Sequence, residues 1–220
     1  MKTNAQLQKD VQDAIKWEPL LHSAEIGVTA KDGVVSLTGV VDSFSKKAEA
    51  EAAAKSIKGV KAIVENIEVN FPNSYTKSDL EIANEVLSAL KTNYSVPDDK
   101  VSVKVENGRV TLDGEVHWNY EKEAAKNAVH LLPGVKAIIN NIKVKSEFHD
   151  RIEQTDIENA LRRSVIDDED IEVSVAGTVV ILTGTVNSWY AKEEAARIAW
   201  KTPGIWEVKN ELTVDYEYAF

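Results

Sequence analysis

The sequence predicts an α+β fold made of three tandem modules, each with a three-stranded mixed sheet and two helices. The first observation is a repeat, because two glycines stand twenty residues apart three times along the chain. These pairs are Gly39 and Gly59, Gly114 and Gly134, and Gly184 and Gly204. The second observation is the apolar period, which is that of a strand around the first glycine and that of a helix between the two glycines.

The repeat predicts modules over residues 1–72, 76–146 and 151–220, each with the element order αββαβ. Two strands joined by a tight turn pair antiparallel, and a strand that follows a crossover helix pairs parallel. Each sheet is therefore expected to be mixed, with both helices packed against it.

Each module opens with a helix whose start is indicated by a capping box, a hydroxyl residue followed three positions later by Glu or Gln. The pairs are Thr3 with Gln6, Ser78 with Glu81, and Thr155 with Glu158. The apolar faces expected to meet the sheet are Leu7, Val11 and Ile15; Leu80, Ala83, Leu87 and Leu90; and Ile157, Ala160, Leu161 and Val165. The first strand begins 23 residues after the cap in two modules and 16 after it in the third. The third module is thus predicted to lack about two helical turns, or an equivalent loop.

A hairpin of alternating apolar residues follows. The first strands carry Ile26 and Val28; Val101, Val103 and Val105; and Ile171, Val173 and Val175. The second strands carry Val35, Leu37 and Val41; Val110, Leu112 and Val116; and Val180, Leu182 and Val186. Asp32-Gly33 and Asn107-Gly108 are typical of tight hairpin turns, which need positive φ angles. In the third module Ala176-Gly177-Thr178 displaces the glycine by one residue, so its turn type stays open.

The second helix is predicted from apolar residues at i, i+3, i+4 and i+7. They are Ala50, Ala53, Ala54 and Ile57; Ala125, Ala128, Val129 and Leu132; and Ala195, Ile198, Ala199 and Thr202. A glycine then ends each helix, and a last strand follows with Ile67 and Val69, Ile142 and Val144, or Leu212 and Val214. The repeated glycines are interpreted as structural: Gly33, Gly39, Gly59, Gly108, Gly114, Gly134, Gly177, Gly184 and Gly204.

Composition argues against several functions. The chain has 43% apolar and 28% charged residues, which is typical of a folded globular protein. A net charge of −10 argues against a nucleic-acid partner, since phosphate contacts need a basic stripe. Residues 149–220 hold 15 acidic and 7 basic residues, so their net charge is −8. No cofactor is expected, and the absence of cysteine removes disulfides and Cys-based zinc sites.

The first ten residues contain no apolar run that could form the core of a signal peptide, and no later segment is apolar enough to span a bilayer. We therefore expect no transmembrane segment and a cytoplasmic location, or a periplasmic one if a leader has been removed. The oligomeric state is not indicated by the sequence.

The module closely resembles the BON domain, named for bacterial osmotically inducible and nodulation proteins. The resemblance rests on Gly108-Arg109-Val110-Thr111-Leu112-Asp113-Gly114-Glu115-Val116 and on Val208-Lys209-Asn210-Glu211-Leu212-Thr213-Val214. It implies a non-enzymatic module associated with phospholipid or envelope surfaces and with osmotic or general stress. Well-known relatives have two copies and an export signal, and a cytoplasmic relative that binds potassium has an additional peptidoglycan-binding type module.

Large aromatic residues stand four to six positions after the strand glycine, where the second helix begins. They are Phe44, Trp118, Tyr120, Trp189 and Tyr190. Such rings form the centres of protein contacts or anchor at membrane interfaces. They also pack at helix starts or between modules. Both interpretations stay open, although at least one ring is expected to be accessible.

The run Asp167, Asp168, Glu169 and Asp170 is a weak candidate for a cation loop, because it lacks the glycine and the ligand spacing of a calcium loop. A solvated acidic loop is the alternative. The four histidines, His22, His117, His130 and His149, show no metal-binding spacing.

The sequence therefore predicts a binding or adaptor protein that contacts a phospholipid surface or a protein partner. The alternative is a sensor that responds to potassium, another cation or an osmolyte, for which the acidic third module is the motive. An enzyme is not expected, because no nucleotide, hydrolase or metalloprotease motif occurs and the modules agree only in framework residues.

Overall fold

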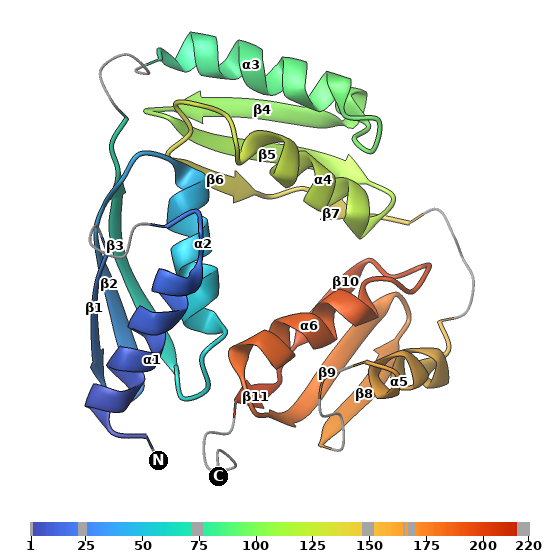
Figure 1. Cartoon of the computed structure of the whole chain (residues 1–220). Coiled ribbons are helices and arrows are strands. Elements are labelled where there is room, and N and C mark those ends of the chain that lie inside the picture. Colours follow the sequence, from blue (N-terminus) through green and yellow to red (C-terminus); the bar gives the residue numbers. More distant parts are fainter. Residues whose placement is uncertain are drawn as a thin grey trace. The chain divides into compact units, whose positions relative to one another are not determined.

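The structure is a computed structural model that describes residues 2–21, 26–71, 77–146, 152–164, 166 and 170–214. Within these residues the order αββαβ occurs three times, with the third strand split in two of the modules (Figure 1). Module 1 consists of α1 (Asn4–Trp17), β1 (Ile26–Lys31), β2 (Val34–Val41), α2 (Phe44–Lys55) and β3 (Ala62–Val69). The predicted α+β class with three repeated modules is confirmed.

Modules 2 and 3 follow the same plan. Module 2 consists of α3 (Asp79–Thr92), the short 3-10 helix η3 (Asp98–Lys100), β4 (Val101–Glu106), β5 (Arg109–Val116), α4 (Asn119–Val129), β6 (Ala137–Asn140) and β7 (Lys143–Val144). Module 3 consists of α5 (Gln154–Arg162), β8 (Ile171–Ala176), β9 (Val179–Val186), α6 (Trp189–Ala199), β10 (Glu207–Asn210) and β11 (Thr213–Val214).

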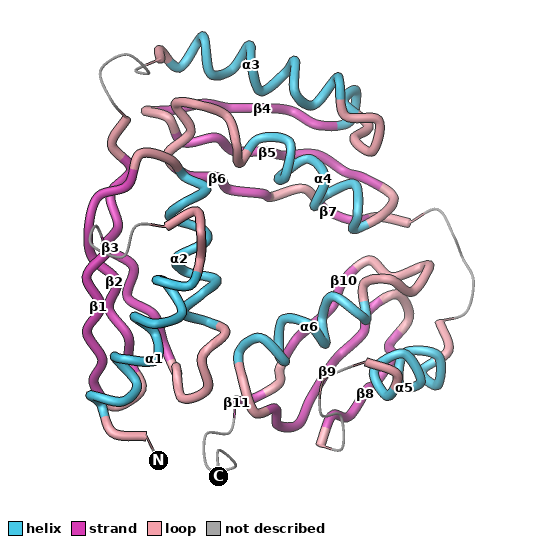
Figure 2. Tube along the Cα trace, in the orientation of Figure 1, coloured by secondary structure: helices cyan, strands magenta, loops and turns pink. Residues whose placement is uncertain are grey.

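The second strand of the hairpin is the central strand of every sheet. In module 2, β4 pairs antiparallel with β5, from Val101 opposite Gly114 to Glu106 opposite Arg109, whereas β6 and β7 pair parallel with β5. Figure 2 shows the helices of each module in cyan beside its magenta strands. Burial alternates along β5, since Leu112 is buried and Asp113 is exposed, so one face of the sheet meets the helices and the other is left open.

The hairpin turns differ in type for a reason visible in their φ angles. Asp32 and Gly33 have φ values of 52° and 85°, and Asn107 and Gly108 have 53° and 78°, as a type I′ turn requires. In module 3 Gly177 has φ 63° and is the first residue of a two-residue turn, the glycine position of type II′. The displaced glycine therefore marks a change of turn type.

The strand glycines allow two chain segments to approach closely. A Cβ atom at Gly114 would lie 2.1 Å from the carbonyl oxygen of Lys100, and one at Gly184 would lie 1.9 Å from that of Asp170. Any side chain at either position would have to displace the start of the neighbouring strand. All nine glycines that the repeat singles out have positive φ angles.

The core-facing side of α3 was predicted correctly at Leu90 but wrongly at Leu80 and Leu87. Ile82, Val86 and Leu90 are buried, whereas Leu80 is 72% exposed and Leu87 is 52% exposed. Both sets have helical spacing, so periodicity alone cannot choose between them. Comparison of the modules identifies the correct set. When Ser78 is aligned with Thr3, the three buried residues align in sequence with Leu7, Val11 and Ile15, which are also buried.

The capping box predicted at Thr155 is also wrong. Helix α5 starts at Gln154, and its N-cap residue is Glu153, whose side chain makes no capping hydrogen bond. Thr155 lies inside the helix. The Glu158 carboxylate accepts a hydrogen bond from Gln154 Nε2 at 2.6 Å, an i,i+4 contact along the helix. Helix α5 has 9 residues, whereas α1 and α3 have 14, so the helix is shorter by five residues. The predicted loss of about two turns, or an equivalent loop, was too large because it was counted from the wrong cap.

The last strand is continuous in module 1 but interrupted in the other two modules. At the end of β6 the Asn140 side chain donates to the carbonyl oxygen of Lys122 at 2.9 Å and accepts from the amide of Ile142 at 3.2 Å. Asn210 makes the same two contacts in module 3. Glu65 stands at the equivalent position of module 1.

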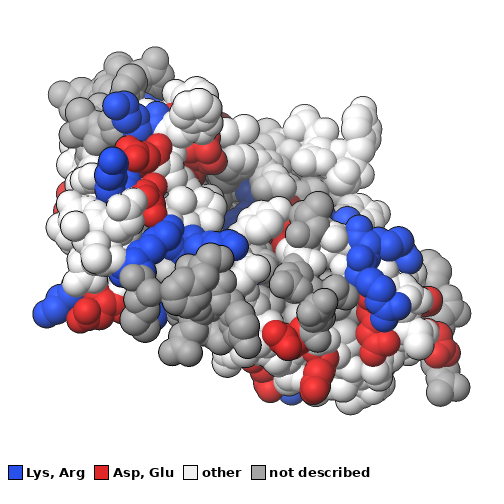
Figure 3. Space-filling model, turned by 60° about the horizontal axis from the view of Figure 1, so that its bottom comes forward, with Lys and Arg blue, Asp and Glu red and all other residues white. Residues whose placement is uncertain are grey.

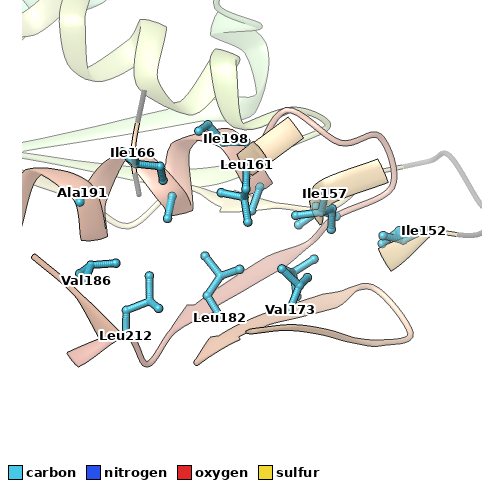
Figure 4. Packing of buried hydrophobic residues seen from close by; sticks show 14 residues of the cluster. Ile152, Ile157, Leu161, Ile166, Val173, Leu182, Val186, Ala191, Ile198 and Leu212 are labelled. Carbon is cyan, nitrogen blue, oxygen red and sulfur yellow. The ribbon is translucent and has the colours of Figure 1, made fainter. Parts of the chain in front are cut away.

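The core of each module lies between the sheet and its helices. Figure 4 shows this packing for module 3, where Ile157 and Leu161 of α5, Leu182 of β9 and Ile198 of α6 point toward one another. The alanines of the second helix that face the sheet, such as Ala125 and Ala195, are fully buried and let the helix lie close to the strands.

Candidate functional site

The predicted aromatic residues lie where the central strand ends and the second helix begins. In module 2, β5 ends at Val116 and α4 begins at Asn119, so His117 and Trp118 form the junction. The Glu121 carboxylate accepts hydrogen bonds from the backbone N–H groups of His117 and Trp118, at 2.9 and 3.0 Å. One acidic side chain therefore holds both donors at the start of the helix.

Two aromatic rings stack at this end of module 2, and strand pairing directs a third toward the same end. Trp118 and Tyr120 stack with ring centroids 6.3 Å apart and planes inclined by 27°, and Tyr120 is 59% exposed. Tyr94 is fully exposed in the segment between α3 and β4. It lies at the same end because the first residue of β4, Val101, pairs with Gly114 close to the end of β5. Tyr94, Trp118 and Tyr120 are called the aromatic end of module 2.

His117 links the aromatic end to two further segments of the module. Its Nε2 atom lies 2.5 Å from Lys100 Nζ, and its Nδ1 atom lies 3.2 Å from the backbone carbonyl oxygen of Lys145. A carbonyl oxygen only accepts, so Nδ1 must donate, and Nε2 then accepts from the Lys100 ammonium. We infer from these two contacts that the ring is neutral with its hydrogen on Nδ1.

Module 3 builds the same junction differently. Ser188 is the N-cap of α6, and its hydroxyl oxygen accepts a hydrogen bond from the Ala191 amide at 3.2 Å. Trp189 is the first residue of the helix and is half-buried, and Tyr190 is 52% exposed.

Counting from the strand glycine shows which rings are equivalent. Trp118 corresponds to Ser43 and Ser188, whereas Trp189 corresponds to Phe44, which is half-buried in module 1. Tyr120 and Tyr190 are truly equivalent, and both are exposed. The prediction that at least one ring is accessible is confirmed.

Two exposed features escaped the sequence analysis. Tyr94 was not selected because it stands outside the strand-to-helix junction in sequence and joins it only through the pairing of β4 with β5. Leu80 and Leu87 were assigned to the core, but they form an exposed apolar stripe on α3. The equivalent residues are Ala5 and Gln12 in module 1 and Thr155 and Arg162 in module 3, so the stripe belongs to module 2 alone.

The acidic run of module 3 lies mostly outside the described residues, which include only its last member, Asp170, an exposed side chain. His22, His149 and the predicted core residue Val165 also lie outside them. Among the residues that the structure describes, no group of three or more His, Cys, Asp or Glu side chains could hold a metal ion.

Charges of both signs occur on the described surface. Figure 3 shows blue Lys and Arg side chains among red Asp and Glu side chains on one face. In module 1 the residue equivalent to His117 is Asp42, which accepts a hydrogen bond from Lys46 Nζ at 2.9 Å. This bond holds the pKa of the Asp42 carboxyl below its usual range.

Taken together, the described elements define a repeat protein in which one small αββαβ module is used three times. The chain belongs to the BON domain family, whose model matches residues 3–70, 78–146 and 149–216. It is similar to Osmotically-inducible protein Y of Escherichia coli strain K12, with 27% identity over 129 residues. That match covers 57% of this chain and 64% of the relative, so it spans less than two thirds of the relative's length.

Two solved structures are also similar, both of CdsD, a structural protein of the type III secretion system of Chlamydia trachomatis. The first, its C-terminal domain, has 18% identity, a TM-score of 0.26 and coverage of 97% of this chain and 98% of the other. The second has 19% identity, a TM-score of 0.23 and coverage of 95% and 93%. TM-scores this low do not indicate a shared overall arrangement. No helix within the described ranges is both long and apolar enough to cross a membrane.

Proposed function

We propose that this protein is a stress-related adaptor of the BON type that binds phospholipid surfaces through the aromatic end of module 2. The observation that carries the proposal is the exposure of Tyr120 beside the stacked ring of Trp118, together with the exposure of Tyr94 before the paired strand β4. Tyrosine and tryptophan favour the boundary between water and lipid, because each has an apolar ring and a polar group. The similarity to an osmotically inducible protein supports the connection with stress.

Charge favours module 2 over module 3 for this role. Residues 74–148 hold 10 basic and 11 acidic residues, a net charge of −1, whereas residues 149–220 carry −8. A surface of anionic lipids repels a module with such an excess of acidic groups. Lys100 and Lys145 lie next to the aromatic end and can approach lipid phosphates, although Asp98 and Asp99 of η3 reduce the local positive charge.

Vesicle flotation tests the proposal. The full chain is mixed with phosphatidylcholine vesicles that either contain or lack phosphatidylglycerol. We expect it to float, and we expect Trp118→Ala and Tyr120→Ala to weaken flotation. Tyr190→Ala is the matched control, because it removes the equivalent exposed ring from module 3 and should leave flotation unchanged.

A protein that floats with neither kind of vesicle would remove the lipid proposal. The aromatic end would then be tested as a contact for a protein partner, by crosslinking from position 120 in cells under osmotic stress. Equal loss of flotation in Tyr120→Ala and Tyr190→Ala would show that the aromatic end of module 2 has no special role.

A further inference from the structure

His117 stands next to the aromatic end of module 2, directly before Trp118. Histidine is the side-chain type whose charge ordinarily changes near neutral pH. The His117 ring makes two contacts that only the neutral form satisfies together. The Lys100 ammonium donates to Nε2 over 2.5 Å, and Nδ1 donates to the Lys145 carbonyl oxygen over 3.2 Å. The ring thus joins the start of β4, the end of β5 and the residue after β7.

We propose that His117 is a proton-sensitive latch that holds the aromatic end of module 2 when the ring is neutral and releases it when the ring is protonated. A proton on Nε2 converts the acceptor into a donor, so the bond from Lys100 is lost. It also places two positive charges about 2.5 Å apart, where repulsion is strong even in a polar environment. Lys100 and the ring must then separate.

Among the described residues, the acidic groups near the ring already have other partners or lie on the side of Lys100. Glu121 already accepts the backbone N–H groups of His117 and Trp118, and Lys145 Nζ lies 3.8 Å from Glu115 Oε2. Asp98 and Asp99 are exposed in η3, on the side of Lys100. The direct contact with Lys100 dominates, because Coulomb interactions weaken with distance and with exposure to water.

The latch belongs to module 2 alone. The equivalent residue, three positions after the strand glycine, is Asp42 in module 1 and Asn187 in module 3. Neither side chain gains a positive charge. Asn187 also shows that the fold accepts an amide at this position, so His117→Asn is a replacement that should fold.

Release of the latch deepens the proposed function, on which this part of the inference rests. Protonation adds a positive charge beside Trp118 and frees the junction from η3. Both changes favour contact with an anionic lipid surface. One added basic charge near such a surface strengthens binding roughly fivefold.

The latch is tested first without lipid, by following the indole N–H signal of Trp118 in NMR spectra of the full chain between pH 8 and pH 5. We expect this signal to move in a one-proton transition together with the ring protons of His117. His117→Asn should abolish the movement. His130→Asn is the matched control. The contact seen for the His130 ring is a local one, with the carbonyl oxygen of Asn127. This replacement should therefore leave the transition unchanged.

Lys100→Gln tests the second half of the latch. It removes the ammonium that opposes the incoming proton, so the transition of the Trp118 signal should move to higher pH. A Trp118 signal that does not respond to pH, or that responds equally in His117→Asn, would overturn the latch. A transition that stays in place in Lys100→Gln would also overturn it.

Vesicle binding then separates regulation from function. Phosphatidylglycerol stays ionised at both pH 7.5 and pH 5.5, so vesicles containing it should bind the natural chain roughly fivefold more tightly at the lower pH. His117→Asn should lose that excess, and His130→Asn should keep it. A Trp118 transition without vesicle binding at either pH would refute the proposed function and leave the latch standing. Equal binding of the natural chain at both pH values would refute the regulation and leave the function standing.

Discussion

Modules 2 and 3 share a centre and differ at their first helix. Leu112 and Leu182 of the central strands are fully buried, as are Ala125 and Ala195 of the second helices. The first helix has 14 residues and a complete capping box in module 2, but 9 residues and no side-chain cap in module 3. The comparison teaches that the hairpin and the second helix are common to the modules, whereas the first helix varies in length and in capping.

Core truncation tests this comparison with the largest effect. Leu112→Ala and Leu182→Ala should each lower the free energy of unfolding by about 2–5 kcal/mol. Because module 3 has the shorter first helix, we expect Leu182→Ala to unfold its module while Leu112→Ala leaves module 2 folded but less stable. Hydrogen exchange followed by mass spectrometry reads each module separately. Unfolding of module 2 with survival of module 3 would reverse the order of stability.

The contact between the first helix and the hairpin turn comes next. The Asp79 carboxylate accepts hydrogen bonds from the amides of Asn107 and Gly108, at 2.7 and 2.8 Å. In module 1 the Asn4 side chain accepts a single bond, from the Asp32 amide at 2.8 Å. Asp79→Ala should cost about 1.5–3 kcal/mol and Asn4→Ala about 0.5–1.5 kcal/mol, because bonds to a charged acceptor are stronger.

Amide exchange in the two turns measures this difference. Exchange should rise more at residues 107 and 108 in Asp79→Ala than at residue 32 in Asn4→Ala. Asp79→Asn, which keeps one acceptor oxygen, should lie between the natural chain and Asp79→Ala. Similar exchange in all the variants would mean that the turn type alone holds the hairpin.

The helix caps give a smaller effect and a sharper contrast. Ser78→Ala removes the hydroxyl that accepts the Glu81 amide and should cost about 1 kcal/mol. Thr155→Ala, the change at the cap that the sequence predicted for module 3, should have almost no destabilising effect, because the helix already begins at Gln154. Urea titration monitored by hydrogen exchange compares the two modules. If Thr155→Ala lowered the stability of its module as much as Ser78→Ala does, Thr155 would have to be the helix cap after all.

The false cap at Thr155 shows what a sequence motif can and cannot decide. The spacing Thr155 to Glu158 fits a capping box, but the chain has a competing bond from Gln154 to Glu158. Which bond forms depends on where the helix meets the sheet. The repeat, two of the three hairpin turns and the residues of the central strands could be predicted, since each follows a local pattern that recurs in the chain.

The candidate site could be predicted only in part. Trp118 and Tyr120 were found because they stand shortly after the strand glycine, where the second helix begins. Tyr94 and Lys100 were missed, because strand pairing between β4 and β5 brings them to the same end. The role of His117 could not be predicted either, since it depends on distances to Lys100 and to the Lys145 backbone, which lie 17 and 28 residues away.

The smallest expected effect concerns the pH dependence of the module 2 cap. The hydroxyl of Ser78 and then its backbone N–H donate to the Glu81 carboxylate, at 2.7 and 2.8 Å, and hold the pKa of Glu81 below its usual range. A carboxyl whose pKa is lower in the folded state stabilises that state above its unfolded pKa, about 4.3 for glutamate. This contribution disappears as the pH falls through the lower folded value. The start of α3 should therefore fray below about pH 4.

Glu81→Gln, which copies Gln6 of module 1 and cannot titrate, should remove that pH dependence. Amide exchange at Glu81 and Ile82 between pH 5 and pH 3, corrected for intrinsic rates, measures the difference. Equal fraying in both proteins would assign the acid response to other carboxyl groups and would leave modules 1 and 2 alike at their first caps.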